Sequence, residues 1–506
     1  NKVNYIECDG SGDKASKLAT IKLTLPGDVS RINYEEDQTG GLKVRWQAGD
    51  KIGVYGSYDD TTPDEFTIKS GVGDNEATFE GKFSEDYEGL FIVAYPYTPG
   101  KSANAIRYGV NLESCQDVTL ANMGKDDAVC CLYDEEEATN RLMHGIAVVK
   151  VTTPDPSTTG QAKVGIRGAW QPGFTYYANS TSNTTYIAVP KSVADTKDMF
   201  VAVYDNNHKC KLYKKSRETA AGIDEGTLAR VNVASESSYE YDCDGLIENH
   251  EYVNMGNGIG MATMNIGANS PTGYGYYFRF GEQNGWKVEG LTGVETLEGK
   301  KEYYADDNTF KVNLMTYTKD TPYTNCLQYS PDGRAMSRSY VSGKTFYIDG
   351  NWGLIDQPGV TDFQGQTDLT VNNTKYGDAA RYNWGGNWMV MNTDISTGWT
   401  KDAVNETTLH GYNLTSNNRT VFLPAACHCV GDLRIGEYGG TGGTDPHYCG
   451  HYWSTLTNDT ANHKAWYWNF VLGRVDFGWT QDGGEEGGRH GGFSIRPIIS
   501  LSSTSN

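Results

Sequence analysis

Short runs of alternating polar and apolar residues recur through the first half of this chain of 506 residues. In residues 20–25, Thr-Ile-Lys-Leu-Thr-Leu, every second side chain is apolar, which is the period of a strand with one buried face. Turn-forming residues, Pro-Gly-Asp, follow at 26–28. We interpret the runs at residues 51–55, 90–95, 146–151, 186–189, 199–204 and 229–233 in the same way. Many short strands separated by turn residues predict β-sandwiches.

The second half carries weaker periodic signals. One short helix is predicted at 378–384, where Asp378 can cap the helix and two alanines follow as good helix formers. Glycine-rich stretches at 436–443 and 483–492 predict surface loops. Residues 287–375 are long polar segments with little periodicity, so their fold is the least well predicted.

Composition divides the chain into domains. A chain of this length exceeds one ordinary core, and its 60 glycines, 34 tyrosines and 21% charged residues favour an all-β protein. Only Trp46 and Trp170 precede residues 235–244, whereas nine tryptophans follow them, which places the main boundary there. An acidic stretch at 134–137 indicates a second connector. We therefore predict domains at 1–138, 139–240 and 245–506. The connection at 235–244 is predicted to be a linker that lets the parts before and after it function separately.

The net charge and the first residue of the chain predict an exported protein. The formal net charge of −21 argues against nucleic acid and against an anionic membrane surface, because both repel an acidic protein. Apolar runs such as 90–95 are far shorter than the roughly 20 residues that cross a bilayer. The chain begins at Asn1, which predicts a mature or truncated product whose export signal has been removed. Ten cysteines are too few for a disulfide scaffold and leave the redox compartment open.

Common catalytic motifs with a recognisable local spacing are missing from the sequence. This lowers the expectation of an enzyme, although two carboxylates that meet in space would suffice for a glycosidase, and 64 Asp and Glu residues leave that alternative open. We predict no catalytic residue and no cofactor.

Cysteines and acidic residues near the C-terminus are weak candidates for metal binding. Cys427, Cys429 and Cys449 lie near histidines, and thiolates with imidazoles can hold zinc. On a strand, Cys427 and Cys429 share one face while His428 points to the other, so we favour buried cysteines that pack as small apolar residues over zinc or a disulfide. The acidic loop at 482–486 has the oxygen ligands that calcium prefers, but a solvated loop is the favoured interpretation.

Aromatic residues of the last domain are candidates for stacking on sugar rings, because a flat apolar face with a polar edge suits carbohydrate. Trp466 and Trp468 lie two residues apart and share a face, which favours packing, whereas Trp479 beside the glycine-rich loop is a better exposed candidate. The predicted ligand-binding residues are Trp399, Tyr438, Trp479, Asp482 and Arg489.

Three stretches of the first half carry a family resemblance. Residues 45–55 (RWQAGDKIGVY), 91–97 (FIVAYPY) and 142–147 (LMHGIA) resemble the "W-x-x-G-D-x-I-G-V-Y", "YPY" and "F-x-H-x-x-A" stretches of the fimbrillin-like proteins of anaerobic gut and oral bacteria. The resemblance implies two tandem transthyretin-like β-sandwiches, export as a lipoprotein, and assembly into a pilus by strand exchange. In such pilins an arginine-specific protease removes the first strand, and Arg31 and Arg45 are the candidate cleavage points here.

The second half resembles a different family. The matching stretches are residues 251–256 (EYVNMG), 262–268 (ATMNIGA), 276–282 (YYFRFGE), 378–386 (DAARYNWGG), 422–426 (FLPAA), 452–454 (YWS) and 493–497 (FSIRP). They are similar to a paralogous bacterial surface domain related to formylglycine-generating enzymes and C-type lectins, which implies a C-type-lectin-like α+β domain. The chain departs from the family pattern at 261–264 and 389–392, and it lacks the "E-P-N" and "W-N-D" motifs of calcium-dependent lectins. Similarity to an oxidase does not carry its chemistry across.

Together these patterns predict a mainly β cell-surface adhesion protein, a fimbrial tip or accessory subunit located at the outer membrane. Residues 1–240 would assemble with other pilus subunits, and residues 245–506 would bind a carbohydrate or a host protein. The membrane would be reached only through a removed N-terminal lipid anchor. A surface glycan-processing enzyme and a structural stalk subunit without ligand binding are the alternatives.

Overall fold

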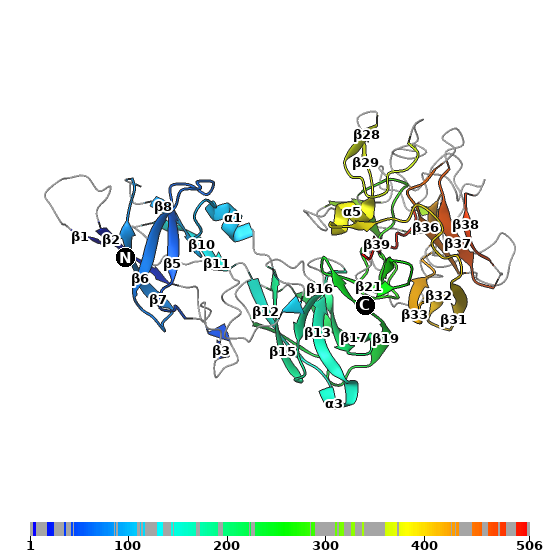
Figure 1. Ribbon diagram of the computed structural model, residues 1–506, viewed down its shortest axis with the longest axis horizontal. Helices are drawn as coiled ribbons and strands as arrows, with labels where there is room; N and C mark the ends of the chain where they lie inside the picture. The colour runs from blue at the N-terminus through cyan, green and yellow to red at the C-terminus, as the bar shows by residue number, and fades with distance from the viewer. Residues whose placement is uncertain are drawn as a thin grey trace. The chain divides into compact units, whose positions relative to one another are not determined.

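The computed structural model of the protein is mainly β, which confirms the predicted class (Figure 1). The structure describes residues 4–6, 18–24, 35–36, 42–43, 45–85, 87, 90–108, 112, 115–116, 129–134, 143–144, 146–167, 173–190, 196–221, 223, 228–283, 285–288, 309–310, 313–317, 325–328, 336–337, 360–371, 374–426, 428–430, 432–434, 448–457, 464–473, 476–481 and 492–502. Most of the poorly periodic segment 287–375 and of both glycine-rich stretches therefore lies outside the described residues. Among the described residues, no helix is both long and apolar enough to cross a membrane.

The chain forms two compact units. Unit 1 comprises Asn1–Trp170, Tyr176–Val203 and Lys214–Ser237, and unit 2 comprises Gln171–Thr175, Tyr204–Tyr213 and Ser238–Asn506. The predicted boundaries at 138 and 240 stay predictions.

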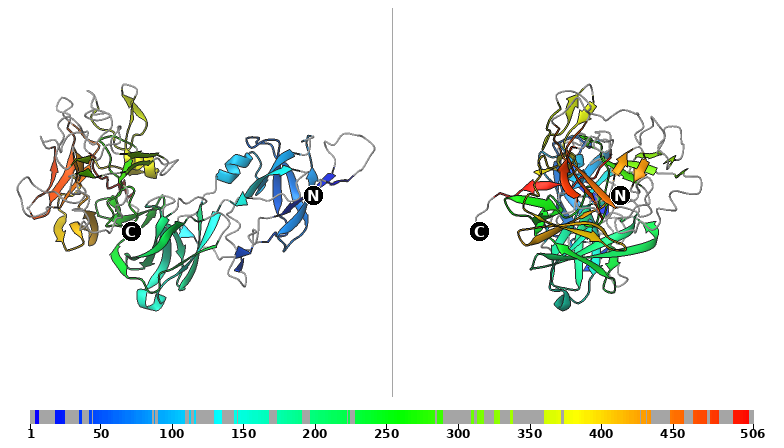
Figure 2. Two further views of the ribbon diagram at one scale, coloured as in Figure 1. Left: turned by 180° about the vertical axis from the view of Figure 1, so that it is seen from behind. Right: turned by 90° about the vertical axis from the view of Figure 1, so that its right-hand side faces the viewer.

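An eight-stranded sheet organises the first part of unit 1, in the order β1-β2-β7-β6-β5-β8-β10-β11 (Figure 1). Its strands are β1 (Asn4–Ile6), β2 (Leu18–Thr24), β5 (Lys51–Tyr55), β6 (Asp64–Ser70), β7 (Glu76–Lys82), β8 (Leu90–Tyr95), β10 (Val129–Asp134) and β11 (Met143–His144), with β3 (Glu35–Glu36) and β4 (Leu42–Lys43) as a separate pair. Helix α1 (Ala103–Tyr108) lies beside this sheet in Figures 1 and 2, and its Ala103 and Ile106 pack with Tyr55 and Ile92.

The stretch around Trp46, which carries the family resemblance, has a structural role in this sheet. The Trp46 ring is fully buried, and its centroid lies 4.9 Å from that of Phe79 and 5.8 Å from that of Tyr95. Gly49 adopts the positive φ of 86° that a turn requires and that glycine adopts without strain. The Asp50 carboxylate accepts hydrogen bonds from the Gln47 amide (2.8 Å) and the Tyr95 hydroxyl (3.1 Å). Residues 47–50 therefore form a turn that leads from Trp46 into β5.

The later strands of unit 1 form smaller pairings. The elements are β9 (Cys115–Gln116), β12 (Ile146–Thr152), α3 (Pro156–Thr159), β13 (Gln161–Arg167), β14 (Tyr176–Asn179), β15 (Thr184–Pro190), β16 (Thr196–Asp205), β17 (Lys209–Ala221) and β18 (Leu228–Asn232). Strand β12 pairs antiparallel with β15 and parallel with β18, while β14 pairs antiparallel with β13 and parallel with β9. All seven strands predicted from the sequence are present.

Unit 2 is built from several small sheets. Its elements are β19 (Ser238–Asp242), β20 (Gly245–Ile247), β21 (His250–Asn254), β22 (Ile259–Ala262), β23 (Gly285–Val288), β24 (Thr309–Phe310), β25 (Asn313–Tyr317), β26 (Asn325–Gln328), β27 (Met336–Ser337), β28 (Leu369–Val371), β29 (Thr374–Tyr376), α5 (Ala379–Trp384), β30 (Trp388–Met389), β31 (Thr400–Asn405), β32 (His410–Ser416), β33 (Arg419–Pro424), β34 (His428–Val430), β35 (Asp432–Arg434), β36 (Cys449–Trp453), β37 (Tyr467–Val471), β38 (Asp476–Thr480) and β39 (Ile498–Ser500). The sheet β20-β21-β22-β39-β30 brings the last strand of the chain beside β22, and β31-β32-β33 and β36-β37-β38 form two further sheets.

The predicted helix at 378–384 is confirmed as α5. Asp378 is its N-cap, and its carboxylate accepts hydrogen bonds from the amides of Arg381 (3.0 Å), Gly365 (2.8 Å) and Val390 (3.0 Å). Burial raises the pKa of Asp378 to about 6, although these hydrogen bonds favour the charged form. One carboxylate therefore joins three segments of unit 2.

The connection predicted as a linker, residues 235–244, contains strand β19, which pairs antiparallel with residues 209–213 of β17. The Asp242 carboxylate binds the Lys209 ammonium (2.5 Å) and the Thr420 amide (2.7 Å). Asp244 binds the Arg419 guanidinium (3.0 Å), together with the amide of Asn254 and the ring of His208. Both aspartates are largely buried, so residues 238–244 of this connection are an integral part of unit 2.

Candidate functional site

Strand β2, which follows the short strand β1 in the chain, is the centre of the candidate site. Its side chains alternate between half-buried and buried along all seven residues, as the sequence predicts. Ala19, Ile21 and Leu23 are fully buried in the core of unit 1. On the other face, Lys22 and Thr20 remain in contact with solvent, and Lys22 forms an ion pair with Glu76 at 2.5 Å.

The groove that holds β2 is formed by β7 and the core beneath it. All seven residues of β2 pair antiparallel with β7, so that Ile21 lies opposite Phe79 and Leu23 lies opposite Ala77. The buried rings of Trp46 and Phe66 belong to the same core cluster. Full burial of Ile21 and of Leu23 stabilises the strand by about 1.5–3 kcal/mol each. Side-chain burial and a complete backbone ladder both hold β2 in place.

Strand β2 lies near one edge of the sheet and early in the chain. Only the short strand β1 lies beyond it in the sheet order, and both strands precede Arg31 and Arg45 in the chain. Loss of the two strands would expose the edge of β7, with its unpaired amides and carbonyls, and an apolar groove beside it. Such an edge is a template for another strand with the same alternation.

Of the two candidate cleavage residues, the structure describes Arg45. Arg31 lies outside the described residues. Arg45 is half-buried, and its guanidinium donates a hydrogen bond to the carbonyl of Gly73 (2.5 Å). The backbone of the next residue, Trp46, is held by hydrogen bonds to the turn between β6 and β7, from its amide to Asp74 (3.1 Å) and from the Gly73 amide to its carbonyl (2.8 Å). Cleavage after Arg45 in the folded chain would require release of Trp46 from the core.

The predicted ligand-binding aromatics are placed differently from one another. Trp399 is only 9% exposed and belongs to a core cluster with Tyr412 and Leu414, so its ring serves packing. Trp479 on β38 remains half-buried, and its ring stacks on that of Trp466 at 5.8 Å with an angle of 8° between the planes. Tyr438, Asp482 and Arg489 lie outside the described residues.

The cysteine cluster is only partly described. Cys427 lies outside the described residues, as does the side chain of Cys429 on β34. Cys449 is buried and disulfide-bonded, so the favoured interpretation of a buried thiol is wrong at this position. No group of three or more His, Cys, Asp or Glu side chains is placed to hold a metal ion within the described part of the chain.

The sequence motifs of the second half mark a buried polar framework whose contacts were not predicted. Arg496, in the FSIRP stretch, is fully buried, and burial lowers its pKa to about 10. Its guanidinium donates hydrogen bonds to the Asn265 side chain (2.9 Å) and to the carbonyls of Ala262 (3.1 Å) and Phe422 (2.9 Å). All three partners lie in stretches that also carry the family resemblance, so this signal reports packing within unit 2.

Comparisons with known proteins give structural neighbours only. No protein-family model and no curated protein sequence matches the chain. It is similar to a fimbrial protein from Bacteroides ovatus (15% identity, TM-score 0.25), over 42% of this chain and 49% of that one. It is also similar to proteins described as "putative cell adhesion protein" from Bacteroides uniformis (15% identity, TM-score 0.23, 43% of this chain and 98% of that one) and from Parabacteroides distasonis (9% identity, TM-score 0.25, 43% and 89%). The chain thus spans about half the length of the first of these structures, and its neighbours are fimbrial and cell adhesion proteins.

Proposed function

We propose that this protein is a non-enzymatic cell-surface adhesion protein, exported as a lipoprotein, that joins a pilus by strand exchange. In this proposal β1 and β2 occupy the groove along β7 until proteolysis removes them, and a strand of a neighbouring subunit then replaces them. The observation that carries the proposal is the geometry of β2, which is fully paired, alternately buried and located before the candidate cleavage residues.

Cleavage is expected at Arg31 rather than at Arg45. Proteases bind their substrates as extended segments, and the residue after Arg45 has its ring in the core and its backbone bonded to Gly73 and Asp74. The energy needed to withdraw Trp46 makes this site resistant while unit 1 is folded, because a buried aromatic contributes about 3 kcal/mol or more.

Residues 245–506 are proposed as the exposed recognition part of a tip or accessory subunit. The half-buried, stacked pair of Trp466 and Trp479 is the aromatic surface that supports this assignment. Burial of Trp399 favours the second candidate function, a stalk subunit without ligand binding, because it removes one of the predicted contact residues. A glycan array that carries neutral and acidic glycans, probed with the full chain and with Trp479→Ala, separates the two functions. Binding that Trp479→Ala weakens supports recognition, and no binding supports the stalk.

Assembly is tested by treating the purified full chain with an arginine-specific protease. We expect release of an N-terminal fragment that contains β2, followed by polymers that resist mild detergent on gels. A synthetic peptide of residues 17–25 should stop polymer growth by filling the groove. The matched control peptide, with Ile21→Asp and Leu23→Asp, should not, since a carboxylate cannot enter the apolar core. Processed chains that stay monomeric, or equal inhibition by both peptides, would rule out strand exchange.

A further inference from the structure

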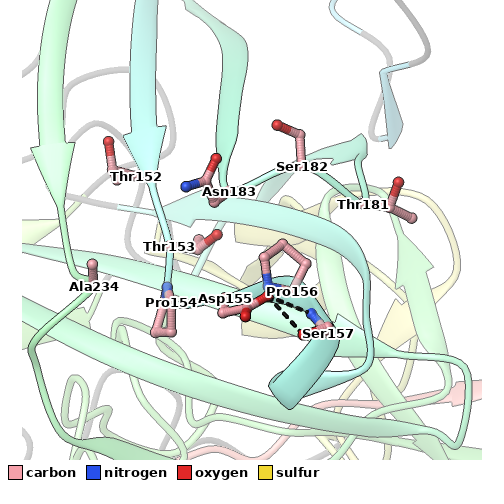
Figure 3. A pocket seen from close by; sticks show the side chains of 10 residues that line it. All are labelled: Thr152, Thr153, Pro154, Asp155, Pro156, Ser157, Thr181, Ser182, Asn183 and Ala234. Carbon is pink, nitrogen blue, oxygen red and sulfur yellow. Dashed lines mark hydrogen bonds between the residues drawn. The ribbon is translucent and has the colours of Figure 1, made fainter.

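A polar cleft lies at one end of the sheet formed by β15, β12 and β18 in unit 1. It has a volume of about 720 Å³, within the range of small-molecule sites. Three segments line it: residues 152–157 from the end of β12 into α3, the turn at 181–183 between β14 and β15, and Ala234 after β18. In the view of Figure 3, Thr181 and Ser182 lie to the right, the segment 154–157 lies below, and Thr152, Thr153 and Asn183 lie to the left.

Buried hydrogen bonds beneath the cleft fix its walls. Gln161 is 5% exposed, and its side-chain amide donates to the carbonyls of Ser180 (2.9 Å) and Ser182 (2.7 Å). Its side-chain oxygen accepts a hydrogen bond from the Thr153 hydroxyl at 2.8 Å. The Thr153 amide also donates to the Asn183 carbonyl at 2.9 Å. One buried side chain therefore ties the two main walls together, and a ligand would meet a largely preformed surface.

Polar side chains on two segments of the lining remain available to a ligand. Within the part of the chain that the structure describes, the side chains of Thr152, Thr181 and Asn183 make no hydrogen bond. Each hydroxyl and the amide can both donate and accept. One Asp155 carboxylate oxygen accepts from the Ser157 amide (2.9 Å) and hydroxyl (2.8 Å), and these bonds lower its pKa and keep it charged. The cleft thus offers two hydroxyls, one amide and one anchored carboxylate.

We propose that this cleft binds a neutral sugar residue of a glycan. A sugar ring presents hydroxyl groups around its edge, which match the hydroxyl, amide and carboxylate groups of the lining, and an apolar C–H face, which matches the rings of Pro154 and Pro156. None of the described residues that line the cleft is Lys, Arg or His, so none of them compensates the charge of a phosphate, a sulfate or an acidic sugar. Asp155 repels such anions, which selects neutral sugars. The site is separate from the aromatic pair of unit 2.

The proposal is tested on the full chain by saturation-transfer NMR with neutral mono- and disaccharides at millimolar concentration, and with the uronic acid of the same sugar as the acidic counterpart. We expect transfer to at least one neutral sugar, no transfer to the acid, and an affinity that 0.5 M NaCl leaves unchanged. No transfer to any neutral sugar, or preference for the acid, would overturn the proposal.

Variants locate the binding. Thr181→Trp places a large side chain in the cleft and should abolish binding, and Asn183→Ala should weaken it about tenfold, as expected for one hydrogen bond. The matched control is Thr61→Trp, an exposed threonine of unit 1 outside the lining. Binding that survives Thr181→Trp but disappears in Trp479→Ala would refute this site and leave the proposed recognition role of unit 2 intact.

Discussion

Truncation of one buried side chain of β2 should weaken the whole candidate assembly site. Leu23 is fully buried opposite Ala77, and replacing a fully buried leucine with alanine costs about 2–5 kcal/mol. The matched control is Lys22→Ala on the same strand, since Lys22 is 42% exposed and its ion pair with Glu76 contributes about 1 kcal/mol at most. The structure therefore predicts that Leu23→Ala destabilises β2 strongly and that Lys22→Ala destabilises it only slightly.

Hydrogen exchange followed by mass spectrometry measures this difference locally. Strand β7 pairs with β2 on one side and with β6 on the other, so it loses one of its two partners whenever β2 leaves the groove. Those amides of residues 76–82 that face β2 therefore report the opening. A cost of 2–5 kcal/mol corresponds to exchange that is at least about 30-fold faster in Leu23→Ala, whereas Lys22→Ala should change it about fivefold at most. Leu23→Ala should also polymerise faster after processing. Equal exchange in the two variants would refute the view that side-chain burial holds β2 in its groove.

Three further predictions concern unit 2. Burial lowers the pKa of His451 to about 3 from an ordinary value of 6.5, so between these pH values the unfolded chain binds a proton that the folded chain does not. The free energy of unfolding should therefore fall as the pH drops from 6.5 to 3, by about 1.4 kcal/mol per pH unit. Urea unfolding of His451→Asn at several pH values should show a flatter slope. Arg496→Met should cost about 3 kcal/mol or more because three buried acceptors lose their donor, and a thermal midpoint equal to that of the parent would contradict this role. Asp244→Ala should lower the free energy of unfolding by about 1–3 kcal/mol, whereas Asp402→Ala, at an exposed residue, should change it by no more than about 0.5 kcal/mol. An equal decrease in both variants would contradict an anchoring role of Asp244.

Local signals predicted the local structure well. The alternation in 20–25 predicted β2 and its buried face, and Asp378 followed by two alanines predicted α5 with its cap. These features depend on neighbours in the sequence, where backbone and capping preferences act directly.

Features that depend on distant residues could not be predicted in this way. The burial of Trp399 is set by Tyr412 and Leu414 on another strand, so its aromatic character suggested a ligand contact that packing removes. The polar cleft in unit 1 arises where three separate segments meet, and none of them has a motif. The disulfide at Cys449 depends on a spatial approach that residue spacing does not report.

The contacts of Asp242 and Asp244 limit which part of this protein can be fused to another protein as a folded unit. A fusion that moved only residues 245–506 onto another carrier would leave Asp242 and Asp244 behind, and with them the partners of Arg419 and of the Thr420 and Asn254 amides. In the fusion these hydrogen-bond donors would lack the carboxylate acceptors that they have in the full chain. Transfer of unit 2 as an intact fold therefore requires the earlier segments 171–175 and 204–213 as well, so its structural boundary does not coincide with one point in the sequence.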